Sequence, residues 1–194
     1  MDKYLSKVTG HALVLGGSGG IGSEVVRALV ANGASAVSFT YGRNQEVAET
    51  LKAEIEALGV KVFIGSMQQR DEKEVADFLT AAVAATGMEI SVAVNAIGTS
   101  PNTPLEEQTQ DEWEKVFDVN VHGCFFSTRV IANRMRDAGT KGSIVLITST
   151  NGVNSQSQIS VHYDASKAAQ AHMMRTIAEY YAKFGIRING VAPG

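Results

Sequence analysis

The chain has 194 residues, of which 44% are hydrophobic, and this suits one folded domain, residues 1–194, with a sizeable core. Its formal net charge of −3 provides no general basic field, so nucleic acid is not an expected partner. Cys124 is the only cysteine, which excludes an intrachain disulfide, and no run of ~18 apolar residues indicates a membrane span, so we expect a cytoplasmic protein.

Short apolar runs alternate with helical patterns along the whole chain. Each run is short enough for a buried strand, and the runs lie at 12–15, 36–40, 60–64, 92–95, 143–148 and 187–192. Six strands interleaved with helices predict an α/β fold, a doubly wound parallel sheet in three layers.

The helices between these strands follow from apolar spacing and from their end signals. One apolar stripe comprises Val47, Leu51, Ile55 and Leu58. Thr109 and Glu112 have the spacing of a capping box, which predicts a long helix over about 109–135. A last helix is predicted over about 160–184, with Gly185 ending it.

A glycine-rich loop joins the first strand to the first helix. Glycines allow a sharp turn and let a pyrophosphate approach the N–H groups at a helix N-terminus. The loop fits two registers, with glycines either at 17, 19 and 22 or at 16, 20 and 22. A triphosphate-binding P-loop is excluded because Ser23, not lysine, follows Gly22. A tight turn without a ligand remains the alternative.

Tyr163 and Lys167 form a Tyr-x-x-x-Lys pattern downstream of the fifth strand. On a helix, this spacing places both side chains on one face, one turn apart. A nearby ammonium favours the phenolate form of a tyrosine, which could then exchange a proton. Alone, the pattern is also typical of a solvated surface pair. Ser149, at the end of the fifth strand, is a candidate partner.

Six separate motifs, in order, resemble those of the short-chain dehydrogenase/reductase family, in its oxoacyl reductase-like branch. They are Gly16-x-x-x-Gly20-Ile21-Gly22, Asn95-Ala-Ile-Gly98, Asn120, Ser149, Tyr163-x-x-x-Lys167 and the final segment 186–194. The resemblance covers essentially the whole chain. It implies a Rossmann-type fold, a nicotinamide cofactor, and the glycine register 16, 20 and 22.

The resemblance also implies a catalytic tetrad of Asn120, Ser149, Tyr163 and Lys167. Tyr163 would be the general acid in carbonyl reduction and the general base in alcohol oxidation. Lys167 would favour its phenolate and bind the nicotinamide ribose. Ser149 would donate a hydrogen bond to the substrate oxygen. Asn120 would hold a water that links Lys167 to solvent. The expected substrate is a small carbonyl compound or alcohol, and no metal site is expected.

Cofactor contacts are predicted at the glycine loop, at the ends of the following strands and at the end of the chain. The residues are Gly16, Ser18, Gly19, Gly20, Ile21, Gly22, Tyr41, Arg43, Asn44, Gln68, Asn95, Ala96, Gly98, Tyr163, Lys167, Pro193 and Gly194. An NAD site favours an acid about twenty residues beyond the glycines. None is present there, and Arg43 could meet a 2′-phosphate. NADP(H) is therefore favoured, and NAD(H) stays possible.

Several positions depart from the family pattern. Leu15 stands where the family usually has Thr, so a hydroxyl contact in the loop is expected to be lost. Gln68 replaces an Asp that commonly meets the adenine. Ser149 lies one position farther from Tyr163 than expected, and Thr150 would restore the shorter spacing. Thr150 is therefore the alternative hydroxyl.

Family members usually continue beyond the equivalent of Gly194 with a substrate-covering loop and a further strand. We therefore expect a longer gene product and a seventh strand outside these 194 residues. The resemblance also implies a homodimer or homotetramer formed through the two long helices. Two alternatives to this enzyme class are a cofactor-binding sensor or structural subunit without turnover, and an epimerase or dehydratase on a related scaffold.

Overall fold

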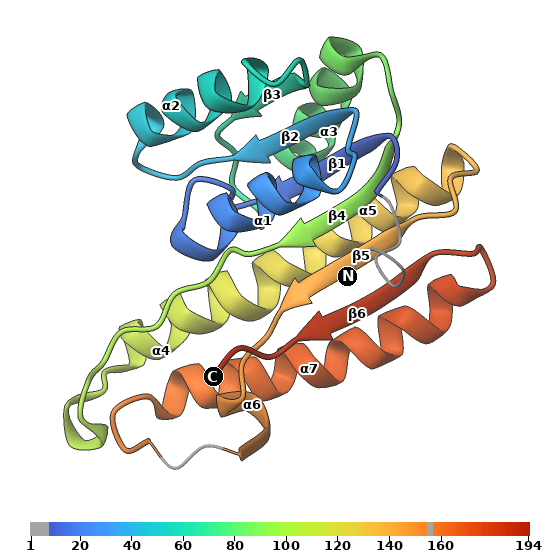
Figure 1. Ribbon diagram of the computed structural model, residues 1–194. Coiled ribbons are helices and arrows are strands. Elements are labelled where there is room, and N and C mark those ends of the chain that lie inside the picture. The colour runs from blue at the N-terminus through green and yellow to red at the C-terminus, as the bar shows by residue number, and fades with distance from the viewer. Residues whose placement is uncertain (1–7, 155–156) are drawn as a thin grey trace.

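The computed structural model describes residues 8–154 and 157–194. Its centre is a sheet of six parallel strands in the order β3-β2-β1-β4-β5-β6 (Figure 1). The strands are β1 (His11–Leu15), β2 (Ala36–Thr40), β3 (Lys61–Gly65), β4 (Ile90–Asn95), β5 (Ser143–Ile147) and β6 (Arg187–Val191). The predicted doubly wound sheet is confirmed, with strand ends within two residues of those expected. The strand order reverses between β1 and β4, and ligands of such sheets bind outside the carboxyl ends at this point.

Helices cover both faces of the sheet, giving three layers (Figure 1). One face carries α1 (Gly20–Ala31) and α2 (Gln45–Glu56); the other carries α3 (Glu72–Thr86), α5 (Cys124–Asp137) and α7 (Val161–Ala182). Successive β1 residues point to opposite faces, as strand geometry requires. Across residues 8–154 and 157–194, no helix is both long and apolar enough to cross a membrane.

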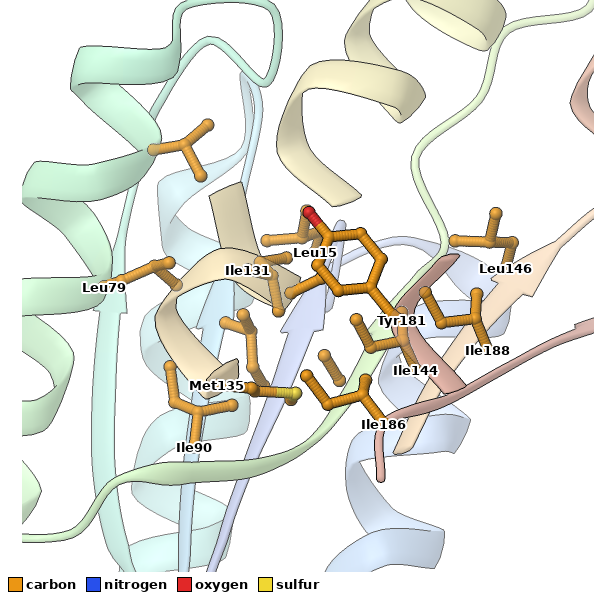
Figure 2. Close-up of a cluster of buried hydrophobic side chains, with 14 of the residues drawn as sticks. Leu15, Leu79, Ile90, Ile131, Met135, Ile144, Leu146, Tyr181, Ile186 and Ile188 are labelled. Atoms are coloured by element: carbon orange, nitrogen blue, oxygen red, sulfur yellow. The ribbon is translucent and has the colours of Figure 1, made fainter. Parts of the chain in front are cut away.

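The larger core cluster lies between the sheet and α3, α5 and α7 (Figure 2). Its buried side chains include Leu15, Leu79, Ile90, Ile131, Met135, Ile144, Leu146, Tyr181, Ile186 and Ile188. Cys124 is fully buried in the same cluster. This packing fixes α5 and α7 against the sheet, and α7 carries Tyr163 and Lys167 of the site described below.

The apolar stripe predicted for α2 is only partly right. Leu51 and Ile55 are buried, together with Ala48, but Val47 and Leu58 are exposed. The helix ends at Glu56, so Leu58 falls beyond its last turn. Val47 belongs to the exposed first turn, which Asn44 caps by accepting a hydrogen bond from the Val47 N–H.

The single helix predicted over about 109–135 is divided in the structure. It consists of α4 (Gln110–Phe117), a π-helical turn η2 (Asp118–Gly123) and α5. The Thr109 hydroxyl caps α4 by accepting from the Glu112 N–H, as predicted. The Glu112 carboxylate, however, accepts a hydrogen bond from the Thr103 hydroxyl. Two short elements, η1 (Leu105–Glu107) and α6 (Asn151–Asn154), were not predicted.

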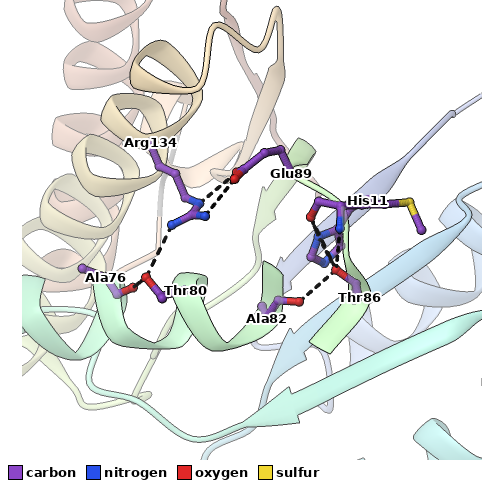
Figure 3. Close-up of polar contacts among 8 residues, drawn as sticks. His11, Ala76, Thr80, Ala82, Thr86, Glu89 and Arg134 are labelled. Carbon is purple, nitrogen blue, oxygen red and sulfur yellow. Dashed lines mark hydrogen bonds and ion pairs between the residues drawn. The ribbon is translucent and has the colours of Figure 1, made fainter. Parts of the chain in front are cut away.

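A buried polar cluster centred on His11 lies at the amino-terminal end of the sheet (Figure 3). The Nδ1 atom of His11 is 2.9 Å from the Met88 carbonyl oxygen, which can only accept, so Nδ1 carries the proton. Nε2, 2.7 Å away from the Ser38 Oγ, therefore accepts from that hydroxyl. Burial lowers the pKa of His11 below its ordinary 6.5. His11 is thus held as one neutral tautomer.

Candidate active site

The glycine loop makes a tight turn between β1 and α1. Gly16 has φ +77°, a left-handed conformation that favours glycine. A Cβ at Gly22 would lie 2.1 Å from the Gly16 carbonyl oxygen, so only glycine permits this approach of helix to loop. The Gly16 N–H donates to the Thr40 hydroxyl on β2 at 2.8 Å. A hydroxyl contact to the loop is therefore present after all, from β2 instead of position 15.

Helix α1 begins directly at the end of the glycine loop. Its N-cap residue is Gly19, which has no side chain to cap the helix, and no acidic residue lies in the first turn. A Cβ at Gly20 would meet nothing within 4 Å, so the space beside the helix start is open. The amino terminus of a helix attracts anions through its N–H groups and its dipole. The loop therefore fits a cofactor pyrophosphate.

A cavity of about 370 Å³ extends from this loop across the carboxyl ends of β2, β3 and β4. It is lined by seven of the predicted cofactor residues, Gly16, Ser18, Gly19, Tyr41, Gln68, Ala96 and Gly98. Arg43 and Asn44 are exposed just beyond its edge, following Tyr41 and Gly42 of its lining. This cavity fits the adenosine half of a dinucleotide.

A second cavity, of about 210 Å³, continues from the first. The two share the lining residues Ala96, Ile97 and Gly98, so they meet at the loop after β4. The second cavity is also lined by five further predicted residues: Ile21, Ser149, Tyr163, Lys167 and Pro193. Three of the four predicted catalytic side chains therefore lie around one space, beside the predicted cofactor site.

Lys167 is almost completely buried, with 3% of its surface exposed. Its Nζ donates to the Ile147 carbonyl oxygen at 2.8 Å and to Gln170 Oε1 at 3.0 Å, and lies 5.6 Å from the Tyr163 ring centroid. Burial lowers the pKa of Lys167, since desolvation disfavours the charged ammonium. The predicted proximity of Tyr163 and Lys167 is thus present in the structure.

Asn120 sits in the π-helical turn and is fully buried. Its Oδ1 accepts from the Thr99 N–H at 2.9 Å, and its Nδ2 donates to the Thr99 carbonyl and to the Ser166 hydroxyl. A Cβ at Gly98 would be 3.5 Å from both Asn120 Oδ1 and Lys167 Nζ, so the two polar groups converge on Gly98. Single π turns are frequent at functional sites. The Asn120 side chain holds the loop after β4 against α7.

Between the two candidate hydroxyl groups, the cavity contains Ser149 and not Thr150. Ser149 is buried and lines the space with Tyr163, whereas Thr150 is exposed and donates to the Pro193 carbonyl oxygen at 3.3 Å. The segment after Ser149 is fixed to α7 by the Asn151 Nδ2, which donates to Asp164 at 2.8 Å. A Cβ at Gly152 would lie within 2.7 Å of the Lys167 and Ala168 backbone.

Other predicted residues lie next to the cavities without lining them. Asn95 is buried beneath the loop after β4, where its Oδ1 accepts from the Ile97 N–H at 3.1 Å. Gly194 packs beside the Thr150 side chain. Gly20 and Gly22 belong to the loop and helix start described above. These residues therefore support the cavity walls without lining them.

Several lining residues were missed by the sequence prediction. They are Thr40, Gly42, Met67, Gln69, Arg70, Asp118 and Val119 in the first cavity, and Ile97, Thr99, Ser100, Ile147 and Thr148 in the second. Most lie in the last residues of a predicted strand or in the loop that follows it, where parallel sheets bind ligands, and this position was the available signal. Arg70 and Asp118 form an ion pair between distant segments, for which the sequence carries no signal.

The chain is similar over most of its length to a known protein family, to characterised relatives and to solved structures. The family described as short chain dehydrogenase matches residues 10–194. Sorbose reductase sou1 of Schizosaccharomyces pombe is 31% identical over 184 residues, which cover 94% of this chain and 71% of that protein. Gluconate 5-dehydrogenase of Gluconobacter oxydans is 32% identical over 184 residues, covering 95% and 70%. A solved structure described as NAD+-bound xylitol dehydrogenase superposes with a TM-score of 0.89 at 26% identity, covering 97% and 72%.

The chain therefore belongs to the short-chain dehydrogenase/reductase family. Its sheet of six parallel strands, flanked by helices, is the Rossmann-type fold of that family. As a member, it is an oxidoreductase that interconverts an alcohol and a carbonyl group of a small molecule with NAD(P).

Proposed function

We propose that this enzyme interconverts a ketone and a secondary alcohol, with NADP(H) as the preferred cofactor and Tyr163 as the proton donor and acceptor. The observation that carries the proposal is the second cavity, which Ser149, Tyr163 and Lys167 line together. It adjoins the cavity assigned to adenosine, so a nicotinamide placed there would lie beside these side chains.

The bound nicotinamide would supply or accept the hydride. In reduction, Tyr163 donates its phenolic proton to the carbonyl oxygen, and Ser149 donates a hydrogen bond to the same oxygen as negative charge develops. Lys167 stabilises the resulting phenolate by its charge. Asn120 keeps the loop at Thr99, which borders the cavity, in place. In oxidation, the same groups act in reverse.

The substrate class is supported by the relatives in general terms. Those with 31–32% identity include a sorbose reductase, a gluconate 5-dehydrogenase and D-arabinitol 2-dehydrogenases. Another relative, 32% identical, is a carboxyl-CoA reductase. We propose a ketose or polyol as the first class to test and a 3-oxoacyl thioester as the second.

The proposed preference for NADP(H) rests on the end of β2. Thr40 and Tyr41 stand there without an acid, and Arg43 is exposed at the rim of the adenosine cavity. A guanidinium at this rim can form charge-assisted hydrogen bonds with a 2′-phosphate. Arg43→Ala should weaken NADPH binding about tenfold or more and leave NADH binding nearly unchanged. An unchanged dissociation constant for NADPH would refute the preference.

The function is tested by the oxidation of xylitol, D-arabinitol and gluconate, and by the reduction of L-sorbose and acetoacetyl-CoA, followed at the nicotinamide absorbance. Tyr163→Phe should abolish turnover and leave the cofactor dissociation constant within about threefold, since only the hydroxyl is removed. Binding of NADPH by the wild type without turnover of any of these or of a broader carbonyl panel would instead support a cofactor-binding sensor or subunit.

A further inference from the structure

Gln170 is a fully buried amide one turn beyond Lys167 on α7. Its Oε1 accepts from the Lys167 ammonium at 3.0 Å, and its Nε2 lies 3.0 Å from the Cys124 Sγ on α5. A buried amide that bonds at both ends requires specific partners, because an unsatisfied amide in the core is costly. No role is assigned to Gln170 in the reaction proposed above.

The orientation of the Gln170 amide follows from its neighbours. An ammonium can only donate hydrogen bonds, so the amide oxygen must face Lys167 and the NH2 group must face Cys124. Burial raises the pKa of Cys124, so the thiol is neutral and its sulfur acts as the acceptor. Lys167 thereby has a hydrogen-bond acceptor in a fixed position, because Cys124 on α5 holds the Gln170 amide in its orientation.

Gln170 also determines which ammonium proton remains for chemistry. The Lys167 Nζ has three N–H groups, and two of them are directed to the Ile147 carbonyl and to Gln170 Oε1. One is left for the cavity that Lys167 lines with Tyr163. Of the titratable groups, Tyr163 on α7 and Cys124 on α5 face the ammonium, and β5 contributes the neutral Ile147 carbonyl. No carboxylate contacts it among the residues that the structure describes.

The Lys167 ammonium, which is nearly buried, is therefore stabilised by the side-chain oxygen of an uncharged amide, that of Gln170. Desolvation favours the neutral amine, and a hydrogen bond to the charged form opposes this effect. A carboxylate in the same position would cancel the positive potential felt at Tyr163, whereas an amide compensates the ammonium without doing so.

We propose that Gln170 is a positioning residue for the reaction, which keeps Lys167 charged and directs its remaining N–H toward Tyr163 and the cofactor cavity. This role rests on the proposed function of Tyr163 and Lys167. The contact between Gln170 and Lys167 is itself independent of any substrate, so it can be tested separately.

The test uses two variants of the full chain. Gln170→Met removes both hydrogen-bonding groups at nearly the same volume, and Gln170→Glu keeps an oxygen acceptor for Lys167. The first measurement is the ionisation midpoint of Lys167, followed by NMR of 13C-labelled lysine side chains and assigned by the signal lost in Lys167→Arg. Gln170→Met should lower this midpoint by about 0.5 pH unit or more, and Gln170→Glu should not lower it.

The second measurement is the pH dependence of kcat/KM for the alcohol of the panel above that wild type oxidises fastest. Oxidation needs the phenolate, so the rate rises with pH. In Gln170→Met the rising limb should move to higher pH by about 0.5 unit or more. Without Gln170, Lys167 is less readily charged and less well oriented, so it stabilises the Tyr163 phenolate less. The dissociation constant for NADPH should change less than the rate at neutral pH.

The outcomes separate the two proposals. If wild type turns over no substrate, or if Tyr163→Phe stays active, the proposed function fails, and the Lys167 midpoint still decides the role of Gln170. If Gln170→Met leaves both the Lys167 midpoint and the rising limb unchanged, the role of Gln170 fails alone. Should Gln170→Met not fold, Gln170→Asn, whose amide is one methylene shorter, carries the same expectation.

Discussion

Gly22→Ala is the substitution whose effect follows most directly from the geometry of the glycine loop. The added Cβ would lie 2.1 Å from the Gly16 carbonyl oxygen, 2.8 Å from its carbonyl carbon and 2.9 Å from the Gly17 Cα. All three neighbours are backbone atoms, so no side chain can move aside. The glycine loop and α1 must therefore move apart to make room for the added Cβ.

The expected cost is at the upper end of that for overpacking, about 3 kcal/mol in the free energy of unfolding. For a domain of this size, that corresponds to a decrease in Tm of roughly 6–12 °C. Moving the loop also displaces the N–H groups proposed to bind the pyrophosphate, so the affinity for NADPH should fall about tenfold or more.

Gly20→Ala is the matched comparison, because a Cβ there meets nothing within 4 Å. Its free energy of unfolding should stay within about 0.5 kcal/mol of wild type. Its Cβ would nevertheless stand in the open space beside the start of α1, so NADPH binding should weaken without loss of stability. Thermal unfolding followed by circular dichroism and cofactor titration measure both effects. A Gly22→Ala protein with the Tm of wild type would refute the argument from close approach.

Three further predictions concern other parts of the molecule. Because burial lowers the pKa of His11, the unfolded chain binds a proton at a higher pH than the folded protein does. The contribution of His11 to the free energy of unfolding is therefore constant above about pH 6.5 and decreases as the pH falls below this value. Urea unfolding at pH 7.5 and 5.5 should show a smaller decrease for His11→Asn than for wild type, and equal decreases would contradict this. Ser149→Ala should lower kcat by about 10²–10³, and Thr150→Ala far less; the reverse order would assign the role to Thr150. Light scattering after size exclusion should give a dimer or tetramer, and a monomer would exclude association through α4–α5 and α7.

The sheet was predictable because its signals are local. Each strand is a short apolar run, and the glycine-rich loop marks the first turn by its sequence context, whereas its register followed only from the family resemblance. The grouping of Ser149, Tyr163 and Lys167 could be predicted only through the family resemblance, since the helical spacing of Tyr163 and Lys167 is common on surfaces. The structure adds that both line one cavity with Ser149.

What was missed depends on contacts between distant segments. The hydroxyl that contacts the glycine loop comes from Thr40, 24 positions after Gly16. The Glu112 carboxylate accepts a hydrogen bond from Thr103, nine positions earlier and outside its helix, and the local spacing carries no signal for this contact. The buried amide of Gln170 reads in the sequence as an ordinary polar helix residue, because its partner Cys124 is 46 positions away.

The π-helical turn at Asp118–Gly123 interrupts the regular α-helical backbone at the point where the site needs Asn120. Deleting one residue there would let α4 and α5 join as an uninterrupted α-helix, which is the more stable backbone form. Each residue of an α-helix advances by about 100°, so the deletion would turn either Asn120 away from Thr99 or Ile131 away from the core. A shortened variant should therefore gain a regular helix and lose either the contact between Asn120 and Thr99 or the packing of Ile131, so a single inserted residue lets one helix serve both the site and the core.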